Sequence, residues 1–356
     1  MTAQTVSDVS SPLARPATKR LAWVDTAKGI CILMVVMLHT VTGVDEAFPG
    51  TSGWMHHLIS FAKPFRMPDF FLVSGLFATA AMARPWRDFL DRKLIYFGYF
   101  LALWMAIILL VKARGMGLTD PQSFLSEYLW GFVEPFSTLW FIHLLPLLFI
   151  ALRLVWTRPL WLVLIGGFGL HLLAAFHLDP NDYGLSSTLT RWTAINAFCL
   201  FFIYFYIGAK AGPRILQWAS RIAAQPLPAL GALLVWALIH GLIWKAGYSS
   251  LPGLGFILGL AGALAVVTAS VLLAKYEPFG FFRHIGSHSL AIYLTFVLPM
   301  AAMRIALLKS GFVTNVDVAS LLVLAVAVTV PIVLDIVVKN TPFSFLYTRP
   351  RWARLT

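Results

Sequence analysis

The sequence predicts an all-α fold, a polytopic integral membrane bundle of about ten transmembrane helices. Of its 356 residues, 59% are hydrophobic and 12% are charged, whereas soluble domains usually carry about 25% charged residues. Apolar runs near the length that crosses the hydrocarbon of a bilayer, about 20 residues, recur along the chain. The segments between these runs are short, so no soluble domain of useful size fits between the spans.

In chain order, the apolar runs predict spans at 26–44, 67–83, 94–113, 138–155, 159–177, 194–212, 227–246, 252–274, 288–308 and 316–338. Turn residues and charges mark the breaks between them, as at Arg84-Pro85, Pro180-Asn181, Pro213-Arg214 and Pro252-Gly253. No internal repeat is evident, so residues 21–340 are expected to form one membrane domain. Residues 1–20 are rich in Ser, Thr, Ala and Pro and lack the apolar core of a signal peptide, which predicts a disordered cytoplasmic tail. Residues 341–356 are expected to form a basic cytoplasmic tail.

The net charge of +12 fits a membrane protein better than a nucleic-acid-binding one. Nineteen of the 27 Lys and Arg residues fall on the side of the predicted spans that holds the N-terminus. By the positive-inside rule, both termini are expected in the cytoplasm, with the protein in the plasma (inner) membrane. No nucleic-acid partner is expected.

The first span contains a histidine, His39, deep in its apolar run. Ionisable groups are expensive in hydrocarbon and persist there mostly when they face a polar cavity, pair with each other, or do chemistry. His39 follows Lys28 by eleven residues, about 16 Å along a helix. Asp25, Lys28 and His39 fall within a narrow arc of one helix face. The alternative is a structural histidine that bonds a neighbouring hydroxyl or carbonyl.

The second span opens with Arg66 and carries Asp69, and these two residues are spaced to pair on one helix face. An arginine at a span end can instead extend to the interface, but the short Asp69 side chain cannot. Asp69 therefore needs a partner, with Arg66, Lys63 and His39 as candidates. A purely structural ion pair is the alternative to a catalytic role.

Four cations, Arg84, Arg87, Arg92 and Lys93, crowd one short loop on the predicted cytoplasmic side. Such a loop can serve topology alone, or it can bind the phosphates of a polyanionic cofactor.

Three further residues are candidates for supporting roles. Tyr293 and Arg304 lie eleven residues apart and so share a face of the ninth predicted span, with Arg304 toward its outer end. Trp140 opens the fourth span, where interfacial tryptophans are common. The sequence contains no HExxH, no GxSxG and no phosphate-binding glycine loop, so a zinc hydrolase or serine hydrolase has no support and no metal is expected.

Four stretches give the chain its resemblance to a known family. They are Asp25-x-x-Lys28-Gly29 leading to His39, the FRMPDFFLVSG segment from Phe65 to Gly75, the segment Leu139 to Phe141, and the segment Ser289 to Tyr293. On these the chain resembles the acyltransferase 3 family of integral membrane acyltransferases, nearest to its fucose 4-O-acetylase-like branch. The first two stretches together are specific, and the last two are weak alone.

The resemblance implies transfer of an acyl group, usually acetyl, from cytoplasmic acyl-CoA to a hydroxyl of an extracytoplasmic glycan or lipid-linked sugar. It implies that His39 is the catalytic candidate and that Arg66 is an associated essential residue. Two positions depart from the family pattern: Phe296 stands where many members have a histidine, and Asp69 stands where an apolar residue is common.

These residues suggest a mechanism. Burial disfavours the charged form of a histidine, so neutral His39 is expected to act as general base. Asp69 is expected to orient the ring, as the acid does in catalytic triads, and Arg66 to stabilise the oxyanion. Arg84, Arg87, Arg92 and Lys93 are the candidates to bind the phosphates of acyl-CoA.

Two other classes of protein stay open. A transporter or flippase for a lipid-linked sugar or small solute would use His39, Asp69 and Arg66 as a polar relay. The paired, broken helices of many transporters are not evident here. The third possibility is a non-catalytic membrane partner in an envelope-assembly complex. The oligomeric state and the acceptor are not specified by the sequence.

Overall fold

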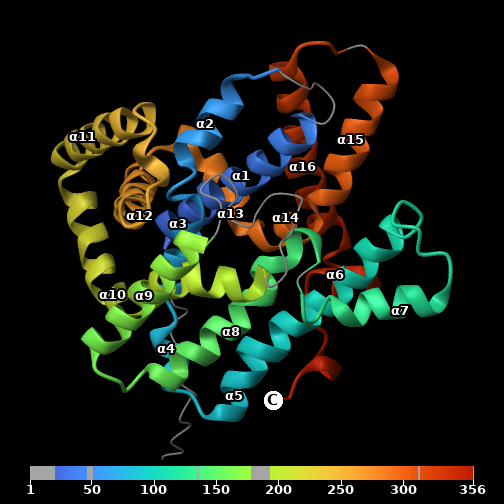
Figure 1. Ribbon diagram of the computed structural model, residues 1–356, viewed down its shortest axis with the longest axis horizontal. Helices are drawn as coiled ribbons and strands as arrows, with labels where there is room; N and C mark the ends of the chain where they lie inside the picture. Colours follow the sequence, from blue (N-terminus) through green and yellow to red (C-terminus); the bar gives the residue numbers. More distant parts are fainter. Residues whose placement is uncertain (1–20, 46–50, 135, 178–192, 312, 356) are drawn as a thin grey trace, which may run out of the picture.

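The computed structural model describes residues 21–45, 51–134, 136–177, 193–311 and 313–355, and every regular element within these ranges is helical (Figure 1). The predicted tail 1–20 lies outside the described residues. The all-α prediction is confirmed. The near end of the bundle is the one where α1 (Ala22–Asp45) begins, and the far end is the one where α1 ends.

In the described ranges, eight helical segments are long and apolar enough to cross a membrane. Besides α1 they are Trp86–Lys112 (α5, η1 and α6), Ser137–Val155 (η2 and α8), α9 (Leu160–His177), α10 (Thr193–Ala224), α11 (Pro226–Lys245), α12 (Leu254–Leu273) and α16 (Val316–Val338). Six of the eight coincide with a predicted span to within a few residues. The helical segment Trp86–Lys112 begins eight residues before its predicted span of 94–113, and α10 runs twelve residues further than its predicted span of 194–212.

The span predicted at 288–308 is broken into α14 (Ser289–Thr295) and α15 (Val297–Ser310), which are bent by 54°. Pro299 explains the bend, because its ring removes a helical hydrogen bond and clashes with the carbonyl four residues earlier, that of Thr295. Phe296 occupies the bend and is fully buried.

The span predicted at 67–83 is the one that differs most from a straight helix. It consists of α3 (Arg66–Gly75) and α4 (Thr79–Met82), and α2 (Trp54–Ala62) precedes them. Pro64 separates α2 from α3 because it has no N–H to donate. Eight of the ten residues of α3 are buried, so this short helix lies inside the bundle.

Close packing of two helix pairs depends on glycine. A Cβ on Gly29 of α1 would lie 2.0 Å from the carbonyl oxygen of Phe282 in α13 (Gly280–Ser287). A Cβ on Gly75 of α3 would lie 2.3 Å from the carbonyl oxygen of Phe205 in α10. Both contacts are with backbone, so only glycine permits these separations.

The largest described core cluster joins side chains of α1, α3, α6 (Tyr96–Lys112), α8 (Trp140–Val155), α10, α14 and α16. At its periphery, α11 has His240 as its buried residue, and α7 (Pro121–Trp130) has none. These two helices stand at opposite sides of the bundle in Figure 1.

The segment after α16 packs back onto the near end of the bundle. It contains two 3-10 turns, η5 (Pro342–Leu346) and η6 (Arg351–Ala353). Trp104 Nε1 donates to the backbone oxygen of Leu346 at 3.0 Å, and Arg349 pairs with Asp91 in the π-helical turn η1 (Asp91–Ile95). The described part of this predicted tail is therefore ordered against the bundle.

Candidate active site

Segments far apart in the sequence line one cavity of about 280 Å³ inside the bundle. Its walls come from α1, α3, α6, α8 and α14. Each of the four stretches that carry the family resemblance contributes to it, through Lys28, Phe70, Ser74, Phe141, Ser289 and Tyr293. Packing alone would not require these four stretches to share one wall, so their convergence identifies the cavity as the candidate binding chamber.

The near end of the cavity carries the first polar pair. Lys28 Nζ lies 3.7 Å from the carboxylate of Asp25, which is buried, while about 43% of the Lys28 side chain is exposed. Lys28 also lines the cavity. The structure thus brings these two supporting residues together and leaves the ammonium group accessible from the cavity.

His39 lies further along α1, about 16 Å beyond Lys28, and does not line the cavity itself. Its ring is half-buried and packs against Phe296, with the ring centroids 5.4 Å apart. The cations of Arg66 and Lys112 both act electrostatically on the imidazole. His39 therefore has the ring of Phe296 as an aromatic neighbour and lies within electrostatic reach of two cations.

Arg66 and Asp69 are both buried but are not paired. Arg66 Nη1 donates to the backbone oxygen of Ile59 at 3.4 Å, and its Nε has no partner among the described residues. Asp69 is fully buried beside the thiol of Cys31, and neither carboxylate oxygen makes a well-formed hydrogen bond.

The position of Asp69 bears on its expected role. Cys31 precedes His39 by eight residues, about 12 Å along α1. Asp69 therefore lies at the depth of Cys31, and in the described structure it does not contact the imidazole. This arrangement does not place Asp69 to orient His39, because that would require a carboxylate–imidazole hydrogen bond.

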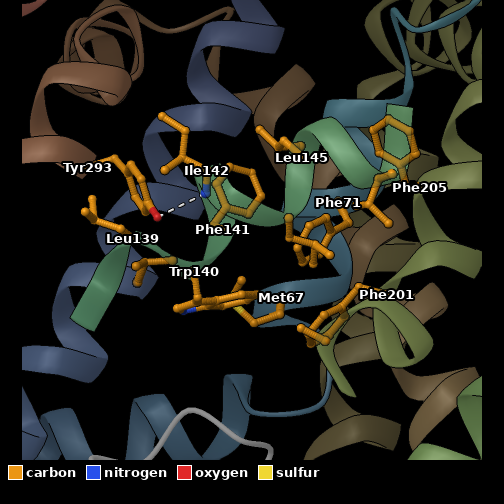
Figure 2. Packing of buried hydrophobic residues seen from close by; sticks show 14 of the residues in the cluster. Met67, Phe71, Leu139, Trp140, Phe141, Ile142, Leu145, Phe201, Phe205 and Tyr293 are labelled. Carbon is orange, nitrogen blue, oxygen red and sulfur yellow. Dashed lines mark hydrogen bonds between the residues drawn. The ribbon is translucent and has the colours of Figure 1, made fainter. Parts of the chain in front are cut away.

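Tyr293 fixes the start of α8. Its hydroxyl donates to the backbone oxygen of Thr138 at 2.6 Å. The same hydroxyl accepts from the backbone N–H of Ile142 at 3.3 Å (Figure 2). Trp140 follows directly on Thr138–Leu139 and is buried, with its ring near those of Phe71 and Phe201. Trp140 is thus a core residue beside the chamber and not a member of an interfacial belt.

Two cations approach the far half of α1. Arg304 Nη1 donates to the backbone oxygen of Gly43 at 3.2 Å, one turn beyond His39. Lys112 Nζ donates to the Ser137 hydroxyl at 3.1 Å. The bend after Thr295 puts Tyr293 and Arg304 on separate helices, so the expectation that they share the face of one straight helix is wrong.

The basic loop at 84–93 is helical from Trp86 onward, in α5 (Trp86–Leu90) and η1, so the expectation of an irregular loop is wrong. Its cations are largely engaged in contacts within the protein. Arg84 and Arg92 each bond Asp88 at 2.8 Å, and Arg87 Nη2 donates to the backbone oxygen of Leu355. Lys93 Nζ lies 4.1 Å from the ring centre of Phe149. A phosphate ligand would have to compete with Asp88 for two of the four cations, an obstacle that the charge count alone does not reveal.

Three residues near this site were not among the sequence-based candidates. Cys31 lines the cavity and contacts Asp69, Tyr96 also lines the cavity, and Lys112 acts on His39. Cys31 follows Lys28 by three residues and so shares a helix face with it, which could have identified Cys31 as a site residue from the sequence. Nothing in the sequence relates Lys112, near the end of a different span, to His39.

Comparison with known proteins supports one family. An acyltransferase domain family matches residues 21–335 of the chain. The chain is also similar to the inner membrane protein YcfT of Escherichia coli K12, with 23% identity over 316 residues that cover 80% of this chain and 81% of YcfT. No solved structure matches the chain significantly.

Proposed function

The chain belongs to the acyltransferase 3 family of membrane acyltransferases, and from this premise we propose that it transfers an acyl group, usually acetyl, from cytoplasmic acyl-CoA to a hydroxyl of an extracytoplasmic glycan or lipid-linked sugar. The proposal includes the predicted topology, in which the protein lies in the plasma (inner) membrane and both of its termini are in the cytoplasm. The near end of the bundle is then the donor side.

One observation carries the proposal: a single helix, α1, connects the chamber to the candidate base. Lys28 and Cys31 line the chamber, and His39 lies on the same helix toward the far end. A donor that enters from the near end and an acceptor that enters from the far end would meet along α1. Transfer across a bilayer requires such a two-sided approach.

The reaction follows from the groups present. His39 takes the proton of the acceptor hydroxyl as its oxygen attacks the thioester carbonyl. Arg66, with an unpartnered Nε, donates to the oxyanion that forms. Collapse of this intermediate breaks the carbon–sulfur bond, and the imidazolium returns its proton to the CoA thiolate. The products are the acyl ester and free CoA.

The donor would be held from the near end. Its pantetheine arm would occupy the chamber past Lys28 and Tyr96 and reach beyond Tyr293, toward Phe296 and His39. Its phosphates would bind the basic loop, where Arg84, Arg87, Arg92 and Lys93 remain our candidates. Binding there requires Arg84 and Arg92 to exchange their bonds with Asp88 for bonds to phosphate.

The proposal is tested by deleting the gene and comparing O-acyl esters on the envelope glycans. Esters should disappear on deletion and return with the wild-type chain and with His177→Ala, whose histidine is exposed near the end of α9. His39→Ala should express normally and restore no esters. Ester formation by that variant would remove His39 as the base.

A second measurement tests whether acyl-CoA is the donor. Purified wild-type protein in liposomes, supplied with acetyl-CoA and an extract of the envelope glycans, should release CoA in step with ester formation. Ester formation independent of acyl-CoA would refute the donor. Movement of a solute across the liposome without CoA release would favour a transporter.

A further inference from the structure

A groove separate from the acylation site lies between α10, α11 and α12 at the near end of the bundle. Its volume is about 520 Å³, and its walls are mainly apolar, including Trp218, Leu233, Trp236 and Leu264. The residues that line it come from the end of α10 and Gln225 after it, from Pro228 to Trp236 of α11, and from Ala261 to Thr268 of α12. The groove therefore runs from the near end of the bundle to about the middle of α11 and α12.

The bilayer has access to this groove because α11 packs loosely. His240 is the buried residue among the twenty of α11, and Leu234 and Leu238 are more than half exposed. An apolar groove excludes water, and at this depth the surrounding medium is hydrocarbon. The occupant of the groove must therefore be largely apolar.

The near end of the groove is polar. Arg221 and Gln225 line it there, at the end of α10. Arg221 is exposed, and its backbone oxygen accepts from the N–H of Gln225. In the part of the chain that the structure describes, its guanidinium makes no hydrogen bond or ion pair. A free guanidinium at membrane-surface height, above an apolar groove, suits a molecule with an anionic head and a hydrocarbon chain.

We propose that the groove binds one anionic phospholipid, with its phosphate at Arg221 and an acyl chain between α11 and α12. The lipid is bound and not acylated, so this site adds a ligand that the transfer reaction does not use.

The site also touches the segment that carries Arg66. The ring of Trp236 packs against the rings of Phe61 and Phe65, at centroid distances of 6.1 and 5.5 Å. One turn later, His240 Nε2 contacts the backbone oxygen of Phe61 at 2.9 Å. Phe65 directly precedes Arg66. A lipid acyl chain in the groove would therefore pack on Trp236 and, through Trp236 and Phe65, support the position of Arg66.

The test is native mass spectrometry of the purified chain with phosphatidylglycerol or phosphatidylcholine of identical acyl chains. Wild-type protein should retain one phosphatidylglycerol in preference to phosphatidylcholine. Arg221→Gln should weaken phosphatidylglycerol binding about five-fold, the effect of one cation near an anionic headgroup. The matched control Arg158→Gln removes another exposed arginine at the near end, outside the groove, and should change nothing.

A second pair of variants tests where the acyl chain of the lipid lies. Ala232 lines the groove and is exposed, so Ala232→Trp should fill the space and displace both lipids without disturbing the core. Leu234→Trp adds bulk on the exposed side of α11 and should leave binding intact. Equal retention of the two lipids, or unchanged binding by Arg221→Gln or Ala232→Trp, would overturn the proposal. Because none of these arms measures acyl transfer, failure here leaves the proposed reaction untouched.

Discussion

The contact between Asp91 and Arg349 holds the C-terminal segment against the near end of the bundle. Arg349 Nη2 and Nη1 bond the two carboxylate oxygens of Asp91 at 2.6 and 3.1 Å, and Nη1 also donates to the backbone oxygen of Asp91 at 2.9 Å. The N–H of Leu355 donates to Asp91 Oδ1 at 2.7 Å. Both ionic side chains are under 10% exposed. We therefore expect this pair to dominate the docking of residues 342–355.

The magnitude follows from burial. Arg349→Met leaves the Asp91 carboxylate buried with the Leu355 N–H in place, and Asp91→Asn leaves a buried arginine without its counter-ion. Removing one partner of a buried pair costs about 3–5 kcal/mol, because the remaining charge stays desolvated. The double variant should cost clearly less than the sum of the two single ones, since it leaves no unpaired charge.

The assay is hydrogen–deuterium exchange of the peptide that ends at Leu355, because the amide of this residue bonds Asp91 directly. Either single variant should raise its exchange rate roughly 100-fold or more. Asp88→Asn is the control: it removes a more exposed aspartate of the same loop, which bonds Arg84 and Arg92, and should leave exchange unchanged. Additive single effects, or exchange no faster than in the control, would refute the reasoning.

Three further predictions concern the site and its packing. Gly29→Ala should destabilise the bundle by about 1–3 kcal/mol because its Cβ would meet backbone. Gly98→Ala, with open space around the added Cβ, should leave the stability unchanged. Equal thermal midpoints of unfolding for the two variants would contradict this prediction. Tyr293→Phe leaves two backbone groups unpaired and should cost about 1–3 kcal/mol, as well as slowing acyl transfer; unchanged melting and transfer would rule out its positioning role. Lys112→Met should lower acyl transfer roughly ten-fold while exposed Lys309→Met does not, and equal rates in the two variants would exclude Lys112 from the site.

The positions of most helices follow from the sequence because hydrocarbon imposes a length on each span. Backbone groups must be satisfied within each span, so an apolar run of about 20 residues has few alternatives to a helix. The predicted segments 26–44, 227–246 and 316–338 match α1, α11 and α16 closely. The segment 67–83 does not form one straight span, because α3 is buried inside the bundle, where neighbouring helices and not lipid decide how far it extends.

The candidate site was accessible from the sequence only in part. Residues on one helix can be related by spacing, and Asp25 and Lys28 do lie together. Contacts between helices cannot be read in this way. Asp69 was expected beside Arg66, Lys63 or His39 and lies beside Cys31. The reason is that the depth at which α3 meets α1 is set by the packing of α3 against both α1 and α10.

The sequence by itself therefore determined the class of the protein, the approximate spans, the family, and the polar residues that hydrocarbon makes costly. Each of these depends on composition or on local spacing, which tertiary contacts do not alter. Tertiary structure alone decided that four separated stretches line one cavity, that Phe296 packs on His39, and that Asp88 engages two cations of the basic loop. These facts depend on helix depth and rotation, which are fixed by close packing at positions such as Gly29 and by the bend at Pro299.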